Sequence, residues 1–419
     1  MERYDIIIAG AGLAGLAAAA TASRAGTRVL ILDEKSPGGR ARTDESDGFR
    51  FNRGPHALAL AGPGRKVLTR LGVRPALHTP PVRGVRLMAD GDLHPLLSRR
   101  VLGLRAAAQL TTAFTRVFRT SLHDSPMLST RDWIASLELT PKAAALLEAV
   151  ARTATYAADL DALTADVPLG QIRAAVRNVG YLDDGWQVLV DGLLTTATAA
   201  GAEFRPRTPV TAIDGEPGAW RVRTLSGEET GAPAVVIATG TPAGARRLLP
   251  ADPGWNDFGP EVTAACLDLG VRHDRTRVTF GLDEPLYLSP HAPAGNLAPA
   301  GQGMVHAARY GPTNPDADRS RLEEFASMAG ISDGDIAASR FLPNMTVVSA
   351  MPPLALGLRG RPPAAVAGCP GLFVAGDWAG PVGWLADASL SSGETAGRLA
   401  AGAVTSPTAR PRQRSASGT

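Results

Sequence analysis

Three glycines near the N-terminus have the spacing of a phosphate-binding turn. Gly10, Gly12 and Gly15 stand directly between an apolar segment and an alanine-rich one. Glycine at these positions allows a tight turn, a close approach of the backbone to a diphosphate, and close packing of a helix on a strand. Asp33 follows Gly15 by eighteen residues, with Glu34 beside it, and could accept hydrogen bonds from ribose hydroxyl groups. The pattern therefore predicts a dinucleotide site.

The segments around these glycines predict the elements that would position them. Residues 5–9 are a short apolar run typical of a β-strand, and an alanine-rich helix is expected as far as Arg24. A second apolar strand is expected over 28–32, so strand, helix and strand follow one another as in a βαβ unit. Because amides at a helix N-terminus carry partial positive charge, Leu13 and Ala14 are expected beside the diphosphate. We expect an α/β fold that opens with a Rossmann-like unit.

Composition and charge argue against several other classes of site. The chain has 419 residues, of which 44% are hydrophobic and 20% charged, a composition typical of a folded protein with more than one domain. The formal net charge of +3 offers no argument for nucleic-acid binding. With two cysteines and seven scattered histidines, neither a disulfide scaffold nor a metal site is expected. No charged leader and no run of about 18 apolar residues is found, so we expect a cytoplasmic protein.

Two kinds of segment alternate along the chain. The first kind contains short buried strands that end in glycine, such as PAVVIATG and GLFVAGD, and the second is helical in its first part and strand-like in its second. We therefore expect a discontinuous nucleotide-binding domain, interrupted twice by a mixed α+β substrate domain. A Pro-, Ser- and Arg-rich tail is expected to be disordered. The nucleotide-binding segments are 1–75, 186–250 and 351–405, the substrate-domain segments are 76–185 and 251–350, and the tail is 406–419.

A series of motifs extends this pattern along the chain. The glycine turn lies in GAGLAGLAAAA, and it is followed by VLILDEKSPGGRART and GFRFNRGPHAL. Later come WQVLVDGLLTTATAAGAEFRPRTPVTAID, AVVIATGTPAGARRLL and GLFVAGDWAGPVGWLADASLSSGETAG. In this order the motifs resemble the flavin amine oxidase and phytoene desaturase superfamily of FAD-dependent oxidoreductases. The resemblance implies that the discontinuous Rossmann-like domain binds FAD, with the residues of the glycine turn at its diphosphate and Asp33 or Glu34 at its ribose.

The resemblance also implies contacts for individual residues beyond this turn. Gly39 and Arg40 would approach the diphosphate, where a guanidinium can offset phosphate charge with directed hydrogen bonds. Val210 would present its backbone to the adenine, and Asp377, preceded by Gly376, would bond the ribitol or diphosphate side. The helix that follows would direct its positive end at flavin N1 and O2. The remaining implied contacts lie beside the isoalloxazine: Gly54, Pro55, Trp384, Leu385 and Ala386.

Two further residues are candidates for the chemistry itself. His56 lies in the loop that the resemblance places beside the isoalloxazine, so it could act as an acid, a base or a polar anchor, or could only orient the substrate. Trp384 is the second candidate, because aromatic residues flank the substrate in amine oxidases, although it and Trp378 could equally serve packing. Neither Cys266 nor Cys369 falls where some relatives attach flavin covalently, so noncovalent FAD is expected. Three residues of the second insert are expected to be structural: Tyr287, His306 and Tyr310.

A missing lysine bears on the reaction. Amine oxidases of this superfamily commonly place a lysine near flavin N5, but residues 260–285 contain none, and none follows Lys142. We therefore expect desaturase-like dehydrogenation of a small, largely apolar substrate by hydride transfer to flavin N5. No second glycine motif with a suitably spaced acid occurs, so oxygen or another acceptor is expected to reoxidise the flavin. The alternatives are an amine or amino-acid oxidase, a flavin-dependent isomerase without net redox change, and a non-enzymatic prenyl or lipid carrier of the GDP-dissociation-inhibitor type.

A basic segment could bring an apolar substrate to the protein. Residues 93–122 carry five arginines and no acid, with apolar residues at helical spacing. Such a segment is expected to form an amphipathic helix or helix pair. It could contact a membrane surface peripherally, or it could simply be a helix with a solvated basic face.

Overall fold

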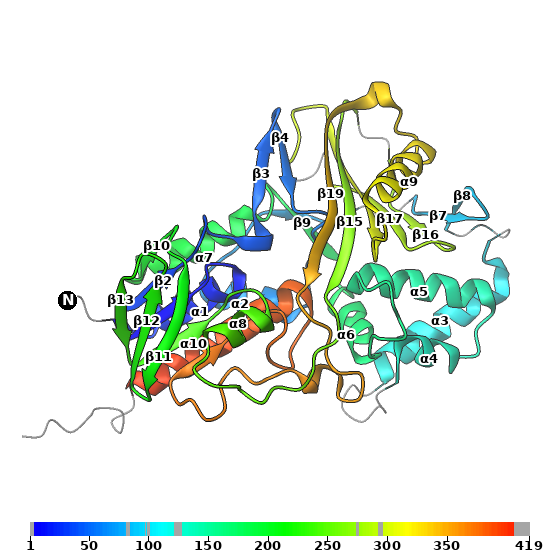
Figure 1. Cartoon of the computed structure of the whole chain (residues 1–419). Helices are drawn as coiled ribbons and strands as arrows, with labels where there is room; N and C mark the ends of the chain where they lie inside the picture. The colour runs from blue at the N-terminus through cyan, green and yellow to red at the C-terminus, as the bar shows by residue number, and fades with distance from the viewer. Residues whose placement is uncertain are drawn as a thin grey trace, which may run out of the picture.

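Two β-sheets organise the computed structural model of the chain (Figure 1). The smaller sheet and its helices lie on the left of the view, a group of helices lies at the lower right, and two long strands run between them. The tail 406–419, expected to be disordered, lies outside the described residues. The structure describes residues 4–80, 84–96, 98, 101–120, 128–273, 276–291 and 296–405.

The smaller sheet has five strands, and every neighbouring pair in it is parallel. Four of the strands are continuous apolar runs that are fully buried. Such runs are typical of parallel strands that are covered on both faces. In sheet order the strands are β10 (Glu203–Arg205), β2 (Val29–Leu32), β1 (Ile6–Ala9), β14 (Ala234–Ile237) and β20 (Leu372–Val374).

Different elements cover the two faces of this sheet. Side chains alternate between the faces of a strand, so Ile6 and Ile8 pack among the covering helices, whereas Ile7 packs with Trp220 and Val222 of a three-stranded antiparallel sheet. The helices are α1 (Leu13–Arg24), α2 (Pro63–Leu71), α7 (Gln187–Ala199) and α10 (Leu385–Thr405), and the antiparallel strands are β11 (Val210–Glu216), β12 (Ala219–Thr224) and β13 (Glu229–Ala232).

The larger sheet has seven strands and is mixed. One of its six pairings is parallel, between the strands at 279–281 and 86–89, and the other five are antiparallel. In sheet order its strands are β19 (Ile336–Val348), β15 (Val262–Val271), β18 (Gly303–Tyr310), β17 (Leu286–Pro290), β16 (Thr279–Gly281), β7 (Arg86–Ala89) and β8 (Asp92–Pro95).

Helices pack against this sheet in two places. One helix buries Leu322 and Phe325 among the central strands, and a group of four helices shares a second core with Leu87. The single helix is α9 (Pro315–Met328). The group of four is α3 (Gly103–Arg119), α4 (Thr130–Ala135), α5 (Pro141–Thr155) and α6 (Asp166–Ala174). The remaining elements are β3 (Thr43–Ser46), β4 (Phe49–Asn52), β5 (Leu58–Ala59), β6 (Leu77–His78), β9 (Val179–Leu182), α8 (Pro242–Leu248) and the short helices η1 (Gly39–Ala41), η2 (Asp333–Asp335) and η3 (Gly357–Gly360).

The α/β fold class predicted from the sequence is confirmed. The strands expected at 5–9 and 28–32 are β1 and β2, and α1 joins them. All strands of the parallel sheet come from the segments expected for the nucleotide-binding domain, and all strands of the seven-stranded sheet come from the other two segments. Within the described residues, no helix combines the length and apolar character needed to cross a bilayer.

The basic segment 93–122 was predicted to be helical over too great a length. Its first residues belong to β8, which ends at Pro95, and α3 begins only at Gly103. Proline lacks an amide hydrogen, so it is compatible with an edge strand such as β8 but not with the interior of a helix. Residues 97, 99–100 and 121–122 lie outside the described part of the chain.

Candidate functional site

A cavity of about 1610 Å³ opens at the carboxyl ends of the parallel strands. Its wall includes the residues that directly follow four of them, namely Gly10 after β1, Asp33 after β2, Ala238 after β14 and Ala375 after β20. Open α/β sheets bind ligands at this edge. The volume exceeds the roughly 300–1,000 Å³ of an ordinary small-molecule pocket, so the cavity has room for a dinucleotide and a second molecule.

The glycine turn at one end of the cavity leaves space for a ligand close to the backbone. A Cβ atom on Gly12 would meet no heavy atom within 4 Å, and Gly12 lines the cavity. Gly15 has a different role, because a Cβ there would lie 1.9 Å from the carbonyl oxygen of Gly10. Gly15 therefore allows the helix to pack on the turn, while Gly12 leaves a cradle that a side chain would fill.

The N-terminus of α1 supplies donors to this cradle. No side chain caps the helix at Gly12, and its first turn contains no acidic residue. The first amides of a helix have no partner within the helix, and the helix dipole makes this end attractive to anions. Leu13 and Ala14, in the first turn, line the cavity. This arrangement fits a diphosphate.

Asp33 is fixed by backbone amides at the end of β2. Its Oδ2 accepts a hydrogen bond of 2.6 Å from the Ala11 amide, and its Oδ1 accepts one of 2.7 Å from the Lys35 amide. Each carboxylate oxygen keeps a second lone pair for a hydroxyl group. Glu34 also lines the cavity, but it is exposed and pairs with the Lys35 ammonium at 3.0 Å. Both acids therefore remain candidates for the ribose.

An ion pair with a buried carboxylate forms another part of the wall. Arg40 Nη1 lies 2.9 Å from Asp377 Oδ2 and donates a second bond of 2.9 Å to the Val347 carbonyl. The Ser349 amide and hydroxyl donate to the two oxygens of Asp377 at 2.9 and 2.8 Å. Burial alone would raise the pKa of Asp377, but Arg40 and Ser349 outweigh it and lower that pKa. Asp377 is therefore an anion that orients Arg40 at the cavity surface.

The far part of the cavity, which we call the substrate half, is lined by residues of α3, α5, α6, β9, β16 and β17 and the residues adjoining them. Most of its side chains are apolar, and a few are tyrosine, threonine, glutamine or histidine. None of these lining residues is charged. The apolar members are Phe114, Phe118, Val150, Ala154, Ile172, Ala175, Val176, Val179 and Phe280.

The loop that carries His56 lies beside the substrate half. Tyr156 donates a hydrogen bond to the Pro55 carbonyl, and His56 Nδ1 lies 2.9 Å from the Gly54 carbonyl oxygen. Deep burial lowers the pKa of His56 to about 4, although the ring still faces the cavity. At neutral pH His56 is therefore uncharged, with Nδ1 beside the Gly54 carbonyl oxygen. Its ring packs against Trp186 at 4.9 Å.

The start of α10 forms another part of the wall. Trp384 is only 1% exposed, and its indole donates a 3.0 Å bond to the Thr155 carbonyl, so its side chain serves mainly packing. Leu385 has a positive φ of 53° and begins the helix. Asp387 follows in the first turn, and its carboxyl accepts a 2.9 Å bond from the Gly64 amide at the start of α2. Burial raises the pKa of Asp387 to about 7.

Most residues expected to contact FAD come together around this one cavity, together with His56. Gly54 does not line it, because its Cα faces Met345, whose Cε would lie 2.7 Å from a Cβ. Gly15 is likewise outside the wall. Sequence reasoning missed Asp387, whose signal was an acid at the start of the last helix, and His291, which has no local signal. The residues that line the cavity are Gly10, Gly12, Leu13, Ala14, Asp33, Glu34, Gly39, Arg40, Pro55, Val210, Gly376, Asp377, Trp384, Leu385 and Ala386.

Comparison with known families agrees with this geometry. The family model described as FAD dependent oxidoreductase matches residues 5–330. The chain belongs to this family. It is therefore an FAD-dependent oxidoreductase, and the superfamily resemblance found in its sequence is confirmed.

Individual relatives match over short stretches of sequence. Phytoene dehydrogenase from Streptomyces griseus is 50% identical over 56 residues, which are 13% of this chain and 11% of that protein. All-trans-retinol 13,14-reductase from Homo sapiens is 41% identical over 58 residues, which are 14% of this chain and 10% of that protein. These matches thus span about a tenth of the length of each relative.

The solved structures share the fold over nearly the whole chain. Putrescine oxidase bound to putrescine superposes with a TM-score of 0.73 at 16% sequence identity, covering 97% of this chain and 100% of that one. At this identity the likeness concerns the fold, and the chemistry has to be argued from the cavity of this chain.

Proposed function

We propose that this oxidoreductase dehydrogenates a small, largely apolar organic molecule, with noncovalently bound FAD as the hydride acceptor. When bound, FAD supplies a two-electron acceptor that can take a hydride from a C–H bond. The observation that carries the proposal is the uncharged, mainly apolar lining of the substrate half.

The same lining disfavours an amine as substrate. A protonated amine that leaves water needs a carboxylate or a comparable partner, and burying it without one is costly. The elements that line the substrate half contribute no carboxylate to it. Among the described residues of the whole cavity wall, the single lysine is Lys35, which lies beside Asp33 at the ribose end.

Different residues around the cavity would bind the cofactor, exclude water and orient the substrate. The α1 turn, Asp33 and Arg40 would hold the dinucleotide, so that its reactive ring extends toward the substrate half. The aromatic and aliphatic wall would exclude water and bind the substrate by its apolar surface. His56, uncharged at neutral pH, would orient a polar group of the substrate or receive a proton from it.

We also propose that α3 lets an apolar substrate reach the cavity from a membrane surface. Phe114 and Phe118 of α3 line the cavity, and Leu104 on the same helix is 76% exposed. The exposed arginines Arg105 and Arg116 complement anionic headgroups. Sedimentation with vesicles that contain an anionic lipid tests this: binding should exceed that to neutral vesicles and should fall in a Leu104→Asp variant. Equal sedimentation with both kinds of vesicle would leave α3 a helix with a solvated basic face.

A spectrum followed by a substrate panel tests the proposed reaction. The purified protein should show the absorbance of oxidised flavin, and acid or heat should release FAD into the supernatant. Anaerobic mixing with retinol in detergent should bleach the flavin, whereas putrescine and cyclohexylamine should not. Admitting oxygen or a quinone should then restore the absorbance. Bleaching by the amines alone would indicate an amine oxidase.

Two other outcomes would point to the remaining alternatives. Product formation that needs reduced flavin but gives no net bleaching would indicate an isomerase. A colourless protein that FAD cannot reconstitute would contradict the proposal and favour a prenyl or lipid carrier.

A further inference from the structure

The strand β17 brings a row of polar side chains to the mainly apolar substrate half. Tyr287 and Ser289 lie two residues apart on this strand, and His291 follows its end by one residue, so all three share one face of the sheet. The amide of His291 continues the pairing with β18 through a 2.7 Å bond to the Met304 carbonyl. Tyr287 and His291 line the cavity, and the function proposed above assigns no polar contact to either of them.

His291 keeps a polar atom that has no partner in the described part of the chain. The residue is 2% exposed, and its Nδ1 is buried without a hydrogen bond. Its Nε2 makes no hydrogen bond to the described residues either, but this atom is not fully buried, so it is the nitrogen that a molecule in the cavity can reach. Buried polar groups nearly always have a partner. An unpaired imidazole in the wall of an apolar cavity therefore indicates a polar group on the molecule that binds there.

Two aromatic neighbours hold the ring of His291 in place. The Tyr181 ring stacks on it, with centroids 3.8 Å apart and planes 15° from parallel, and the Tyr181 hydroxyl is itself fixed by a 2.7 Å bond with Ser289. The His306 ring meets the His291 ring edge-on, with centroids 4.5 Å apart. A ring that is packed in this way does not turn freely, so the direction of its hydrogen bond is set before a ligand arrives.

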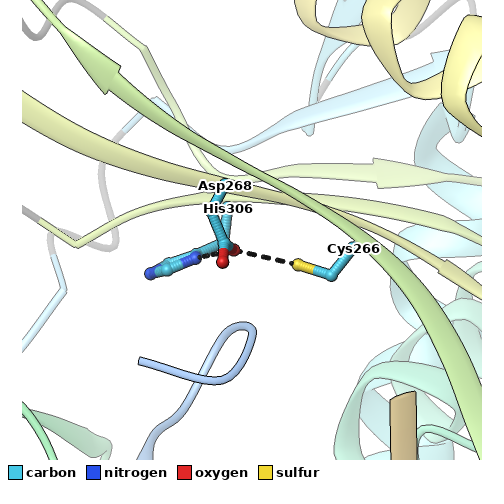
Figure 2. A group of neighbouring side chains, drawn as sticks. All are labelled: Cys266, Asp268 and His306. Carbon is cyan, nitrogen blue, oxygen red and sulfur yellow. Dashed lines mark hydrogen bonds and ion pairs between the residues drawn. The ribbon is translucent and has the colours of Figure 1, made fainter. Parts of the chain in front are cut away.

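His306 is fixed in turn by a buried network (Figure 2). Its Nδ1 lies 2.5 Å from Asp268 Oδ1, which also accepts a 3.1 Å bond from the Cys266 thiol. Asp268 Oδ2 accepts two bonds from Arg340, at 2.6 and 3.1 Å. Cys266, Asp268 and His306 each offer one possible metal ligand within 4.8 Å of the others, but the guanidinium on the same carboxylate opposes a cation. The network is therefore better described as a support for the wall that contains His291.

The group that His291 binds should be uncharged. Burial, together with the nearby imidazoles of His306 and His56, lowers the pKa of His291 well below its usual value, so the ring is neutral at pH 7. Burial also raises the pKa of Tyr181 and of Tyr287, so both phenols keep their protons. Among the described residues that line the substrate half, none is charged. Neither a carboxylate nor an ammonium group would find a counter-charge there.

A hydroxyl group fits this position better than other uncharged polar groups. A neutral imidazole carries its proton on one nitrogen, so Nε2 of His291 is either a donor or an acceptor. A hydroxyl group can both donate and accept, and it therefore satisfies either form of the ring. A carbonyl oxygen can only accept, so it satisfies one form and leaves the other unpaired.

We propose that His291 is a specificity-determining residue that binds a hydroxyl group of an otherwise apolar substrate. The inference rests on the proposed function, in which the substrate half receives the molecule to be dehydrogenated, and it names the substrate class as an apolar alcohol. The hydrocarbon part of the alcohol would contact the apolar wall, which includes Phe114, Ile172 and Phe280. The single hydrogen bond to His291 would fix its orientation.

Binding of compounds that share one alkyl chain tests this role of His291. The FAD-loaded protein is dialysed to equilibrium against decan-1-ol, decan-2-one, decylamine or decane, and the bound compound is measured by gas chromatography. In His291→Phe the affinity for decan-1-ol should fall about fivefold relative to that for decane, the factor expected for one hydrogen bond. An unchanged ratio would overturn the proposal. So would a larger loss for decan-2-one or for decylamine than for decan-1-ol, because His291 would then bind a carbonyl or an ammonium group.

Two further variants separate a hydrogen bond from packing. In His291→Gln the side-chain amide offers a donor and an acceptor at about the reach of Nε2, so much of the preference for decan-1-ol should return. Val150 lines the same half of the cavity, and Val150→Ala removes only apolar surface, so it should weaken decan-1-ol and decane alike. A loss in His291→Gln as large as that in His291→Phe would mean that packing explains the effect, and the proposal would be wrong.

Bleaching of the flavin distinguishes failure of this inference from failure of the proposed function. If retinol bleaches the flavin but His291→Phe leaves the ratio of the decan-1-ol and decane affinities unchanged, the role of His291 is refuted and the proposed function stands. If the ratio depends on His291 but retinol does not bleach the flavin, the hydroxyl site is supported and the proposed dehydrogenation is contradicted.

Discussion

The carboxyl group of Asp387 makes a testable link between pH and stability. Asp387 is 4% exposed, its Oδ1 accepts one hydrogen bond from the Gly64 amide, and its Oδ2 is buried without a partner in the described residues. A Cβ on Gly62 or Gly64 would lie within 2.4 Å of this carboxyl, so these glycines at the start of α2 leave just enough room for it. Burial of a singly bonded carboxyl favours its neutral form and raises the pKa of Asp387 to about 7.

The sign and size of the pH dependence of stability follow from this pKa. The folded protein binds the Asp387 proton up to pH 7, whereas the unfolded chain releases it near pH 3.8. The contribution of Asp387 to the free energy of unfolding is therefore fully present below pH 3.8 and is lost as the pH rises through 7. The difference between the two pKa values corresponds to about 4 kcal/mol in the free energy of unfolding. The part of this free energy that is lost between pH 5 and pH 8 is about 3 kcal/mol.

Replacing Asp387 by Asn should remove this dependence. Asparagine keeps an acceptor for the Gly64 amide and cannot ionise, so the variant should gain about 3 kcal/mol relative to the wild type between pH 5 and pH 8. The assay is urea unfolding of both proteins at the two pH values, with saturating FAD. The difference in unfolding free energy between variant and wild type at pH 5 serves as the baseline for altered packing. An equal difference between variant and wild type at both pH values would refute the reasoning.

Three further predictions concern the cofactor and the reaction. Gly12→Ala should fold normally but bind FAD roughly tenfold more weakly, because its Cβ enters the cradle; fluorescence titration with FAD and thermal unfolding check this. Gly15→Ala should abolish soluble expression, because its Cβ would collide with the Gly10 carbonyl oxygen. Asp377→Asn should lower the free energy of unfolding by about 2 kcal/mol, because the buried carboxylate loses its charged hydrogen bonds with Arg40 and Ser349, and an unaltered urea midpoint would contradict this. His56→Phe should slow flavin bleaching by the substrate without altering FAD content; a coloured variant with wild-type rates would exclude any role for the ring in the reaction.

The parts of the site that depend on local sequence could be predicted. The glycine turn, its helix and the acid after the second strand are set within about thirty residues by turn geometry and strand periodicity. The contacts between distant parts of the sequence could not be found in this way. His306, expected to be structural, meets Asp268 because two strands pair in one register, and Asp387 meets Gly64 across 323 residues of sequence. Such contacts depend on long-range packing, which no local pattern encodes.

The substrate-domain helix was misjudged for a related reason. Apolar periodicity alone predicted a helix or helix pair over 93–122, but Pro95 and Gly103 lie inside that span. Proline and glycine disfavour a helix interior. The backbone preference of these two residues therefore outweighed the hydrophobic pattern.

The long strand β19 links the two sides of the site. Arg340 of this strand bonds Asp44 and Asp268, its Val347 carbonyl accepts from Arg40, and Ser349 just beyond it bonds Asp377. The strand pairs along β15 with three shifts in register, and its residues 342–347 line the cavity. A displacement of β19 would therefore disturb the cavity wall and the Arg40–Asp377 pair together. We therefore expect the substrate to enter near α3, where Phe114 and Phe118 line the cavity, rather than by a movement of this strand.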